Sequence, residues 1–165
     1  MAKPRSFHDK LSDDKDFPRV QSLTGGMRRR YGPGTILLPA PWQVRELMHR
    51  VPRGRVTTIN QIREALARQH RATVACPIVT GIHARIVAGA AGEDLAAGRR
   101  RITPFWRTLK DHGEINPKYP GGLVGQRRRL MAEGHRIVVR GNRMFVVGYE
   151  GSLVHVRRRL NPKAV

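Results

Sequence analysis

Few side chains in this sequence could act as a nucleophile, an acid–base catalyst or a metal ligand. The single cysteine, Cys76, precedes Pro77 at the expected start of a helix, where a thiolate would be stabilised. A lone cysteine is more often a small buried apolar residue, so both interpretations stay open. The seven histidines are dispersed, and no Cys-x-x-Cys or His-Glu-x-x-His spacing indicates a metal site. We therefore expect no metal and no cofactor.

Arginine is the side chain that offers clear binding chemistry, because its planar and weakly hydrated guanidinium group suits phosphate contacts. The formal net charge is +20, from 32 Lys and Arg residues against 12 Asp and Glu residues, which favours a polyanionic partner. Any one cluster could be a solvated basic surface, but four together predict phosphate contacts. The clusters are residues 28–30, 99–101, 127–129 and 157–159, and Arg53 and Arg55 belong to the same expected footprint.

Length and composition suit one compact domain with extensions, since the chain has 165 residues of which 39% are hydrophobic. The most apolar run, residues 36–44, is broken by Pro39 and Pro41 and is shorter than the ~20 residues that span a membrane. The first residues lack the apolar region of a secretory signal. We expect a monomeric cytoplasmic protein without a membrane partner.

The elements that must position these side chains begin after a polar arm, residues 1–34, which we expect to contribute little core. Pro41 suits the first turn of a helix over residues 41–49, with a core stripe of Val44, Leu47, Met48 and Val51. After a turn over residues 51–55, a second helix begins at Thr58, which has capping-box spacing with Gln61.

A third helix is predicted from Pro77 to about residue 97, and two helices joined by a short polar turn favour a helix-turn-helix. Its two sides differ in residue size. One side carries Ile78, Val79, Ile82 and Ile86, and the other carries Pro77, Thr80, Gly81, Ala84, Ala88 and Ala91. The small side would allow close approach to a nucleic-acid groove or to another helix, and the pattern favours neither.

The last third of the sequence predicts shorter elements. Residues 102–109 are expected to be extended, residues 111–113 form a turn, and a helix after the loop 117–122 ends at Gly134. A β-hairpin turns at Gly141 and Asn142, with a possible third strand over residues 153–156. The fold class is therefore α+β, mainly α, a winged-helix-like or helix-turn-helix domain over residues 35–134 followed by a C-terminal β-hairpin and basic tail over residues 135–165.

Four blocks resemble, in order, the DNA-binding domain of the O6-alkylguanine-DNA alkyltransferases, with a likeness that covers about residues 41–134. They are residues 51–62 (VPRGRVTTINQI), 104–107 (PFWR), 121–123 (GGL) and 130–134 (LMAEG). The resemblance implies a domain that binds the minor groove of double-stranded DNA and rotates a damaged guanine out of the duplex. In that family a cysteine in a Pro-Cys-His-Arg motif then accepts the alkyl group.

The acceptor chemistry is missing from this sequence, because Phe105 stands at the cysteine position and Trp106 at the position of its activating histidine. A phenyl ring cannot accept an alkyl group and an indole is no general base, so we expect no enzyme activity. The sequence resembles the alkyltransferase-like branch, which lacks the cysteine, keeps the lesion pocket and flags damage for nucleotide excision repair. This resemblance implies a nucleoid-associated DNA repair protein.

A base pocket is expected at Phe105, Trp106, Arg107 and Tyr119, because a flipped base needs a π surface in an apolar site. Ordinary core packing of these aromatic residues is the alternative. Glu133 matches the acid that orients the family's histidine, and here it could accept a hydrogen bond from the Trp106 indole or pair with an arginine.

The expected DNA-binding residues lie on the helix-turn-helix and on the helix before Gly134. They are Arg53, Arg55, Thr58, Asn60, Gln61, Thr80, Gly81, Ala84, Arg85, Arg127 and Arg128. The family's phosphate-pressing tyrosine is replaced by Ile59 and its intercalating arginine, aligned from Pro77, by Gly81, so we expect Arg85 to substitute for the latter. These departures leave an alternative function, an architectural or regulatory nucleic-acid-binding protein without lesion recognition. A third possibility is an enzyme that uses Cys76.

Overall fold

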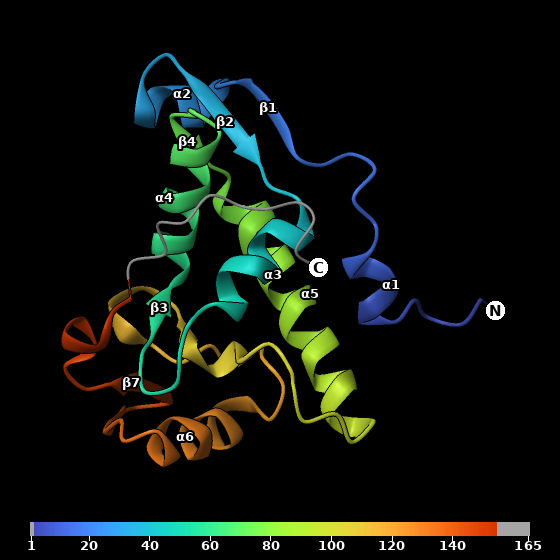
Figure 1. Cartoon of the computed structure of the whole chain (residues 1–165). Coiled ribbons are helices and arrows are strands. Elements are labelled where there is room, and N and C mark those ends of the chain that lie inside the picture. The colour runs from blue at the N-terminus through green and yellow to red at the C-terminus, as the bar shows by residue number, and fades with distance from the viewer. Residues whose placement is uncertain (1, 155–165) are drawn as a thin grey trace.

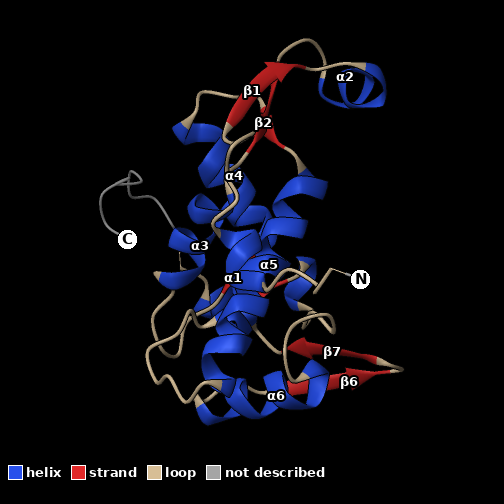
Figure 2. Cartoon of the chain, turned by 90° about the vertical axis from the view of Figure 1, so that its right-hand side faces the viewer, coloured by secondary structure: helices blue, strands red, loops and turns tan. Residues whose placement is uncertain are grey.

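Three helices occupy the middle of the protein in the computed structural model, which describes residues 2–154 (Figure 1). They are α3 (Pro41–His49), α4 (Ile59–Gln69) and α5 (Pro77–Ala96). A three-stranded sheet lies at one end of this group, and α6 (Gly122–Ala132) lies with a β-hairpin at the other (Figure 2). The architecture is α+β, as the sequence predicts, with six α-helices in the described part of the chain.

The predicted starts of the three central helices are confirmed. Pro41 and Pro77 occupy first-turn positions, where a missing backbone N–H costs no hydrogen bond. The Thr58 hydroxyl accepts a hydrogen bond from the Gln61 amide at 3.2 Å, and the Gln61 side chain bonds back to the Thr58 amide. Each start is set by a local signal, so it is readable from sequence.

The core lies between these helices. The expected stripe of α3 is buried, and it packs with Ile62 and Leu66 of α4 into one hydrophobic cluster that also includes Phe105 and Leu130. A smaller cluster of Leu23, Ile36 and Val74 lies under the three-stranded sheet. The central cluster therefore joins the helix-turn-helix to the segment that carries Phe105.

Most of the small side of α5 enters the core, although Pro77 and Gly81 of that side are exposed. Thr80, Ala84, Ala88 and Ala91 are buried, whereas Ile78 and Ile82 are exposed. Of the two alternatives for the small side, the structure has the helix-packing one, because α5 packs against α3 and short side chains let two helices approach closely.

Residues 2–34 contribute to the core, contrary to the expectation for a polar arm. They form α1 (Phe7–Leu11), β1 (Arg19–Ser22) and α2 (Gly25–Tyr31). Strand β1 pairs antiparallel with β2 (Thr35–Leu38), which pairs parallel with β4 (Val74–Ala75). Leu23 is buried beneath this sheet. The sequence hides this contribution because its few apolar residues are too widely spaced to form a periodic pattern.

Helix α1 is attached to α5 by specific contacts. The Phe7 ring covers Gly89, where a Cβ would overlap the ring. The Glu93 carboxylate accepts hydrogen bonds from the backbone amides of Phe7 and His8 at 2.8 and 3.2 Å, and so caps the start of α1. His8 Nε2 lies 2.9 Å from the Asp94 carboxylate. The N-terminal segment is thus part of the packed domain, and the division of the chain at residue 34 stays a prediction.

The segment around Phe105 is only partly extended. Phe105–Arg107 forms a 3₁₀ turn, and only β5 (Thr108–Leu109) is a strand, paired parallel with β3 (Thr57–Thr58). The prediction of an extended conformation over residues 102–109 is therefore wrong for the 3₁₀ turn. Consecutive residues of a strand point to opposite faces, whereas the turn allows the adjacent Phe105 and Trp106 to be buried together.

The C-terminal elements agree with their predictions. The turn Asp111–Gly113 and helix α6 are present, and β6 (Ile137–Arg140) and β7 (Arg143–Val146) form the predicted hairpin. Leu153 makes a single bridge to Val56, flanked by hydrogen bonds from the Val56 amide to the Ser152 carbonyl and from the Val154 amide to the Val56 carbonyl. The rest of the predicted third strand and the basic residues 157–159 lie outside the described residues.

Candidate nucleic-acid interface

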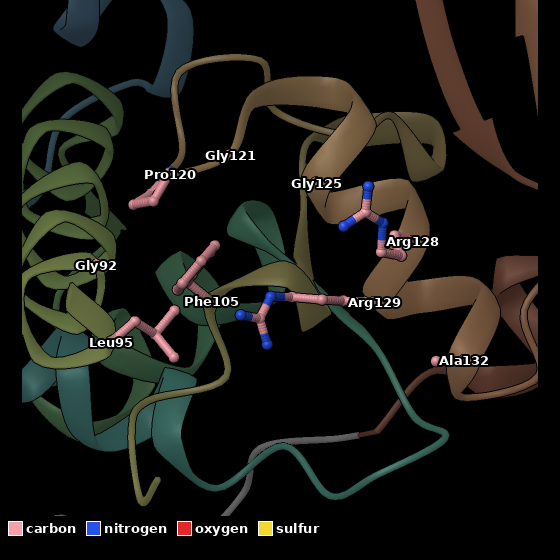
Figure 3. Close-up of a pocket in the computed structure, with 9 residues that line it drawn as sticks. All are labelled: Gly92, Leu95, Phe105, Pro120, Gly121, Gly125, Arg128, Arg129 and Ala132. Atoms are coloured by element: carbon pink, nitrogen blue, oxygen red, sulfur yellow. The ribbon is translucent and has the colours of Figure 1, made fainter. Parts of the chain in front are cut away.

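A pocket of about 440 Å³ lies between the C-terminal part of α5, the 3₁₀ turn and α6 (Figure 3). Its walls are mostly apolar or glycine backbone, and two arginines stand on the α6 side. The lining residues are Gly92, Leu95, Phe105, Pro120, Gly121, Gly125, Arg128, Arg129 and Ala132. Its size falls within the range of small-molecule sites, which is ~300–1,000 Å³.

Phe105 is the one predicted base-pocket residue that lines this pocket. Its residue surface is only 1% exposed, because its ring packs edge-on against Trp106 at 5.3 Å and against Tyr119 at 6.2 Å between centroids. These contacts hold the phenyl ring in one place. The site behind the pocket is therefore an aromatic cluster with Phe105 nearest to the opening.

Trp106 and Arg107 support the pocket through Glu133. The Trp106 indole donates a hydrogen bond to the Glu133 carboxylate at 3.0 Å, and the Arg107 guanidinium forms an ion pair with it at 2.7 Å. The Gly54 amide donates a third bond at 3.2 Å, and Arg107 also donates to the Val51 carbonyl at 2.7 Å. Both expected roles of Glu133 are thus present together.

The charge of Glu133 is stabilised where it lies. Burial would raise the pKa of this carboxyl, but hydrogen bonds from Arg107, Trp106 and the Gly54 amide outweigh burial and lower the pKa below its ordinary value. The ion pair is well enclosed, since the Arg107 and Glu133 side chains are only 14% and 4% exposed. The network ties the turn after α3 to the 3₁₀ turn and to the end of α6.

Tyr119 lies inside the protein rather than in the pocket. It is buried against Phe105, and burial raises the pKa of its hydroxyl. Its neighbours Pro120 and Gly121 line the pocket instead. Trp106, Arg107 and Tyr119 therefore do not line the pocket, and their expected contact with a base stays a prediction.

Arg128 and Arg129 bring positive charge to the pocket. Both line it, and the Arg129 guanidinium lies 4.5 Å from the centroid of the Trp106 ring, so that its side chain reaches from α6 toward Phe105 (Figure 3). Neither forms an ion pair with any carboxylate of residues 2–154. Arg127 is exposed on α6 outside the pocket.

Sequence reasoning missed most of the pocket walls, including Arg129. Gly121 and Gly125 are four residues apart around the start of α6, and Gly92 precedes Leu95 on α5. Small residues at such spacings leave room beside a helix, and this was the available signal. It could not be interpreted without knowing that α5 and α6 face each other across Phe105.

The predicted residues of the helix-turn-helix are partly engaged inside the protein. Thr58 and Gln61 cap α4, and Asn60 donates a hydrogen bond to the Asp111 carboxylate. Arg53 is exposed and bonds to the Ala132 carbonyl at 3.1 Å, while Arg55 is exposed in the same turn. The two arginines are accessible to solvent, whereas Thr58, Asn60 and Gln61 form hydrogen bonds within the protein.

One face of α5 is open to solvent in the first part of the helix. It consists of Ile78, Gly81, Ile82 and Arg85, and we call these four residues the open face. Gly92 follows Arg85 by seven residues, which is two helical turns, but the Phe7 ring of α1 covers Gly89 between them, so the open face ends before the pocket wall. Arg85 and Gly81 are exposed, whereas Thr80 and Ala84 are buried, and the predicted contacts of all four residues with DNA stay predictions.

Cys76 lies far along α5 from the pocket. It is the residue before Pro77 at the start of the helix, half-buried beside the small cluster of Leu23, Ile36 and Val74. The pocket is near the other end of α5, at Gly92 and Leu95. In residues 2–154 there is no group of three or more His, Cys, Asp or Glu side chains that could hold a metal ion.

Among the helices of the described residues, none combines the length and the apolar character needed to cross a membrane. Comparison with protein-family models gives no match, and comparison with curated proteins gives none.

Two solved structures are similar in backbone arrangement. One is S. pombe Atl1 in complex with damaged DNA containing O6-carboxymethylguanine, with 18% sequence identity and a TM-score of 0.48. Another is S. pombe ATL in complex with DNA, with 19% identity and a TM-score of 0.46. Each match covers 69% of this chain and 93% of the other chain. The likeness concerns the fold, at low sequence identity.

Proposed function

We propose that the protein is a non-enzymatic DNA-binding protein of the alkyltransferase-like kind, which docks in the minor groove and takes an alkylated or otherwise modified base into the pocket beside Phe105. The observation that carries this proposal is the position of Phe105. The residue that the resemblance aligns with the acceptor cysteine lines a preformed pocket of about 440 Å³.

The pocket walls provide binding but no transfer chemistry. The lining side chains belong to Leu, Phe, Pro, Ala and Arg, beside three glycines, and none is a nucleophile at neutral pH. An aromatic ring and apolar walls suit the face of an unstacked base, whose stacking on a protein aromatic is worth ~1–3 kcal/mol. The site therefore supports capture of a base without a covalent product.

The charges around the pocket suit the DNA backbone. Arg128 and Arg129 stand at the pocket, Arg85 lies on the open face, and the chain has a formal charge of +20. A base that leaves the duplex draws its phosphates toward the protein, where guanidinium groups can bind them. Each phosphate neutralised releases counterions, so binding becomes weaker as salt is raised.

The remaining parts of the proposal follow from the resemblance. The modified base leaves the duplex by rotation, and Arg85 takes the place of the family's intercalating arginine. The protein acts as a cytoplasmic monomer at the nucleoid and presents the damage to nucleotide excision repair. These steps have their support in the aligned blocks at residues 51–62 and 104–107.

The test compares two otherwise identical duplexes, one of which carries O6-methylguanine, at several salt concentrations, with the intact protein mass recorded after incubation. We expect tighter binding to the modified duplex and an unchanged mass. A Gly125→Leu variant should fill the pocket from α6, because the space around a Cβ at this position is empty. It should lose the preference for the lesion and keep its affinity for the unmodified duplex.

Gly26→Leu is the matched control, since it makes the same change on an open face of α2, at the far end of the molecule (Figure 1). It should keep the lesion preference. Equal and steeply salt-dependent binding of both duplexes by the unmodified protein would instead indicate the alternative, a general nucleic-acid-binding protein. A mass increase on Cys76 would show that the protein is an enzyme.

A further inference from the structure

Exposed arginines gather at the end of the molecule that the three-stranded sheet forms, opposite α6 (Figure 1, Figure 2). They come from α2, from β1 and from the turn that follows α4. We call this group the sheet-end surface, and it consists of Arg19, Arg28, Arg29, Arg30 and Arg71. None of the five forms an ion pair with a carboxylate of residues 2–154.

Helix α2 is anchored so that its arginines face outward. Met27 and Tyr31, four residues apart and therefore on one side of the helix, pack against the small cluster under the sheet. Arg28, Arg29 and Arg30 lie between these two anchors, and all three are exposed. The packing of Met27 and Tyr31 therefore presents three adjacent positive charges to solvent.

Hydrogen bonds hold the turn after α4 beside the loop that carries α2. The Thr73 amide donates to the Thr35 carbonyl at 3.0 Å, and the Thr35 amide donates to the Thr73 hydroxyl at 3.0 Å. The Leu23 amide donates to the Gly34 carbonyl at 2.9 Å and closes the loop. Arg71, two residues before Thr73, thus belongs to the same end of the sheet as α2.

The composition of this end favours phosphate as the partner group. Residues 17–45 and 65–92 contain no Asp, Glu or Lys, so all of their fixed charge is arginine, whose planar fork matches phosphate oxygens. The nearby Glu64 is paired with Arg68 at 3.7 Å. Neither α2 nor the turn after α4 exposes a large apolar side chain, whereas the buried centre of a protein interface is apolar.

The sheet-end surface and the proposed base pocket lie at different ends of α5. Pro77 begins the helix directly after β4 and Cys76, and Gly92 lines the pocket. These two residues are ~22 Å apart along the helix axis, from the rise of 1.5 Å per residue. A duplex seated at one end does not reach the other end without running along α5.

Negative charge lies along α5 between the two ends. Residues 7–17 follow this helix, because Phe7 covers Gly89 and the Phe17 ring meets the His83 ring edge-on at 4.9 Å between centroids. This segment carries four Asp residues against two Lys residues. Carboxylates repel phosphates, so the covered side of α5 disfavours a duplex that continues from the pocket to the sheet. The two ends therefore suit separate DNA segments.

We propose that the sheet-end surface is a second nucleic-acid-binding site, through which one protein molecule holds a second segment of duplex DNA by its phosphates. The proposal rests on the proposed function only for the first DNA segment, and the second segment needs neither the pocket nor a modified base. Phosphate contacts carry no sequence information, so any duplex can occupy the second site. Each contact releases counterions, so this binding weakens as salt is raised.

The test measures capture of a fluorescent DNA duplex by a biotinylated duplex on beads, with the full-length protein as the link. We expect capture, and sedimentation velocity with excess duplex should show complexes of one protein and two duplexes. The variant with Arg28→Gln, Arg29→Gln and Arg30→Gln should reduce capture about tenfold, because it removes three phosphate contacts. Its affinity for the first duplex should change less than about twofold.

The matched control removes three exposed positive charges from other parts of the surface, with Lys118→Gln, Arg136→Gln and Arg140→Gln. It should keep the capture of the second duplex. Circular dichroism of both triple variants checks that the helices are retained, since glutamine favours a helix about as well as arginine does.

The inference would be overturned by an absence of capture with the unmodified protein, or by equal capture with the two triple variants. Linked complexes that contain two protein molecules would also overturn it, because each copy would then hold one duplex. Failure of the proposed function is a separate result. It appears as equal affinity of the unmodified protein for a first duplex with and without O6-methylguanine, and it leaves the capture of a second duplex unchanged.

Discussion

The pocket and the open face of α5 are held in different ways. Behind the pocket, Glu133 binds Trp106, Arg107 and the Gly54 amide, so the wall that carries Phe105 is fixed to three separate segments. On the open face, Ile78 and Arg85 are positioned only by the backbone of their own helix. The pocket is therefore organised before any ligand binds, whereas the open face gains its contacts from a partner. Substitutions in the first region should affect folding, and those in the second should affect binding.

The largest effect is expected from Arg107→Ala. It would leave the Glu133 carboxylate enclosed without its cation, and breaking a buried ion pair from one side costs ~3–5 kcal/mol of unfolding free energy. Urea denaturation followed by circular dichroism measures this loss. A decrease of less than ~1 kcal/mol would show that the pocket wall does not depend on the network.

Arg85→Ala is the matching substitution on the open face. It should change the unfolding free energy by less than ~0.5 kcal/mol relative to the unmodified protein, because the side chain is exposed. It should weaken binding to every duplex and reduce the salt slope by about one phosphate contact. If both arginine variants lost stability equally, the contrast between the two regions would be wrong.

Two glycines of α5 provide a comparison of intermediate size. Gly89→Ala places a Cβ against the Phe7 ring, so α1 must shift, which should cost ~1–3 kcal/mol. Gly81→Ala meets no atom within 4 Å and should add up to ~1 kcal/mol, because alanine favours the helix. Thermal denaturation shows whether each substitution lowers or raises the stability of the protein. If both substitutions changed the stability in the same direction, the contact between Phe7 of α1 and Gly89 would not contribute to stability.

The smallest expected effect is the dependence of stability on pH that histidine protonation causes. Burial lowers the pKa of His83, although its hydrogen bond to the Pro39 carbonyl acts in the other direction, and burial also lowers the pKa values of His49, His70 and His135. A histidine with a folded-state pKa below its unfolded value, ~6.5, binds fewer protons when folded. Stability is therefore complete above this pH and falls as pH decreases through it.

Melting temperatures measured between pH 7.5 and pH 5.5 should accordingly decrease toward the acid end, and the His83→Gln variant should show a shallower decrease. A flat profile would contradict the lowered pKa values of these histidines.

The parts of the fold that the sequence predicts well depend on local signals. Pro41, Pro77 and the Thr58–Gln61 pair define helix starts through contacts within one turn, and Gly141 defines the hairpin turn. The order of the blocks around Phe105 located the pocket segment, because aligned motifs carry their positions with them. The sequence therefore predicts the central helices, the hairpin and one residue of the pocket wall.

The parts that the sequence did not reveal depend on contacts between distant segments. Hydropathy alone gives no sign that Thr80 is buried while Ile78 is exposed, because the choice depends on how closely α3 approaches α5. Similarly, Phe7 matters only because Gly89, far along the chain, leaves space for its ring. Trp106 and Tyr119 pack against Phe105 without lining the pocket, and neither motif nor periodicity can distinguish these two positions.

The bridge between Val56 and Leu153 bears on the order in which the protein folds. Val56 directly precedes the helix-turn-helix, yet its backbone partners are Ser152 and Val154, near the end of the described chain. Contacts between such distant residues require closure of a long loop, which slows folding relative to helix formation. During synthesis, α3 and α4 can therefore form early, and β3 can pair with β5, while the backbone of Val56 lacks its partners until nearly all of the described chain has emerged.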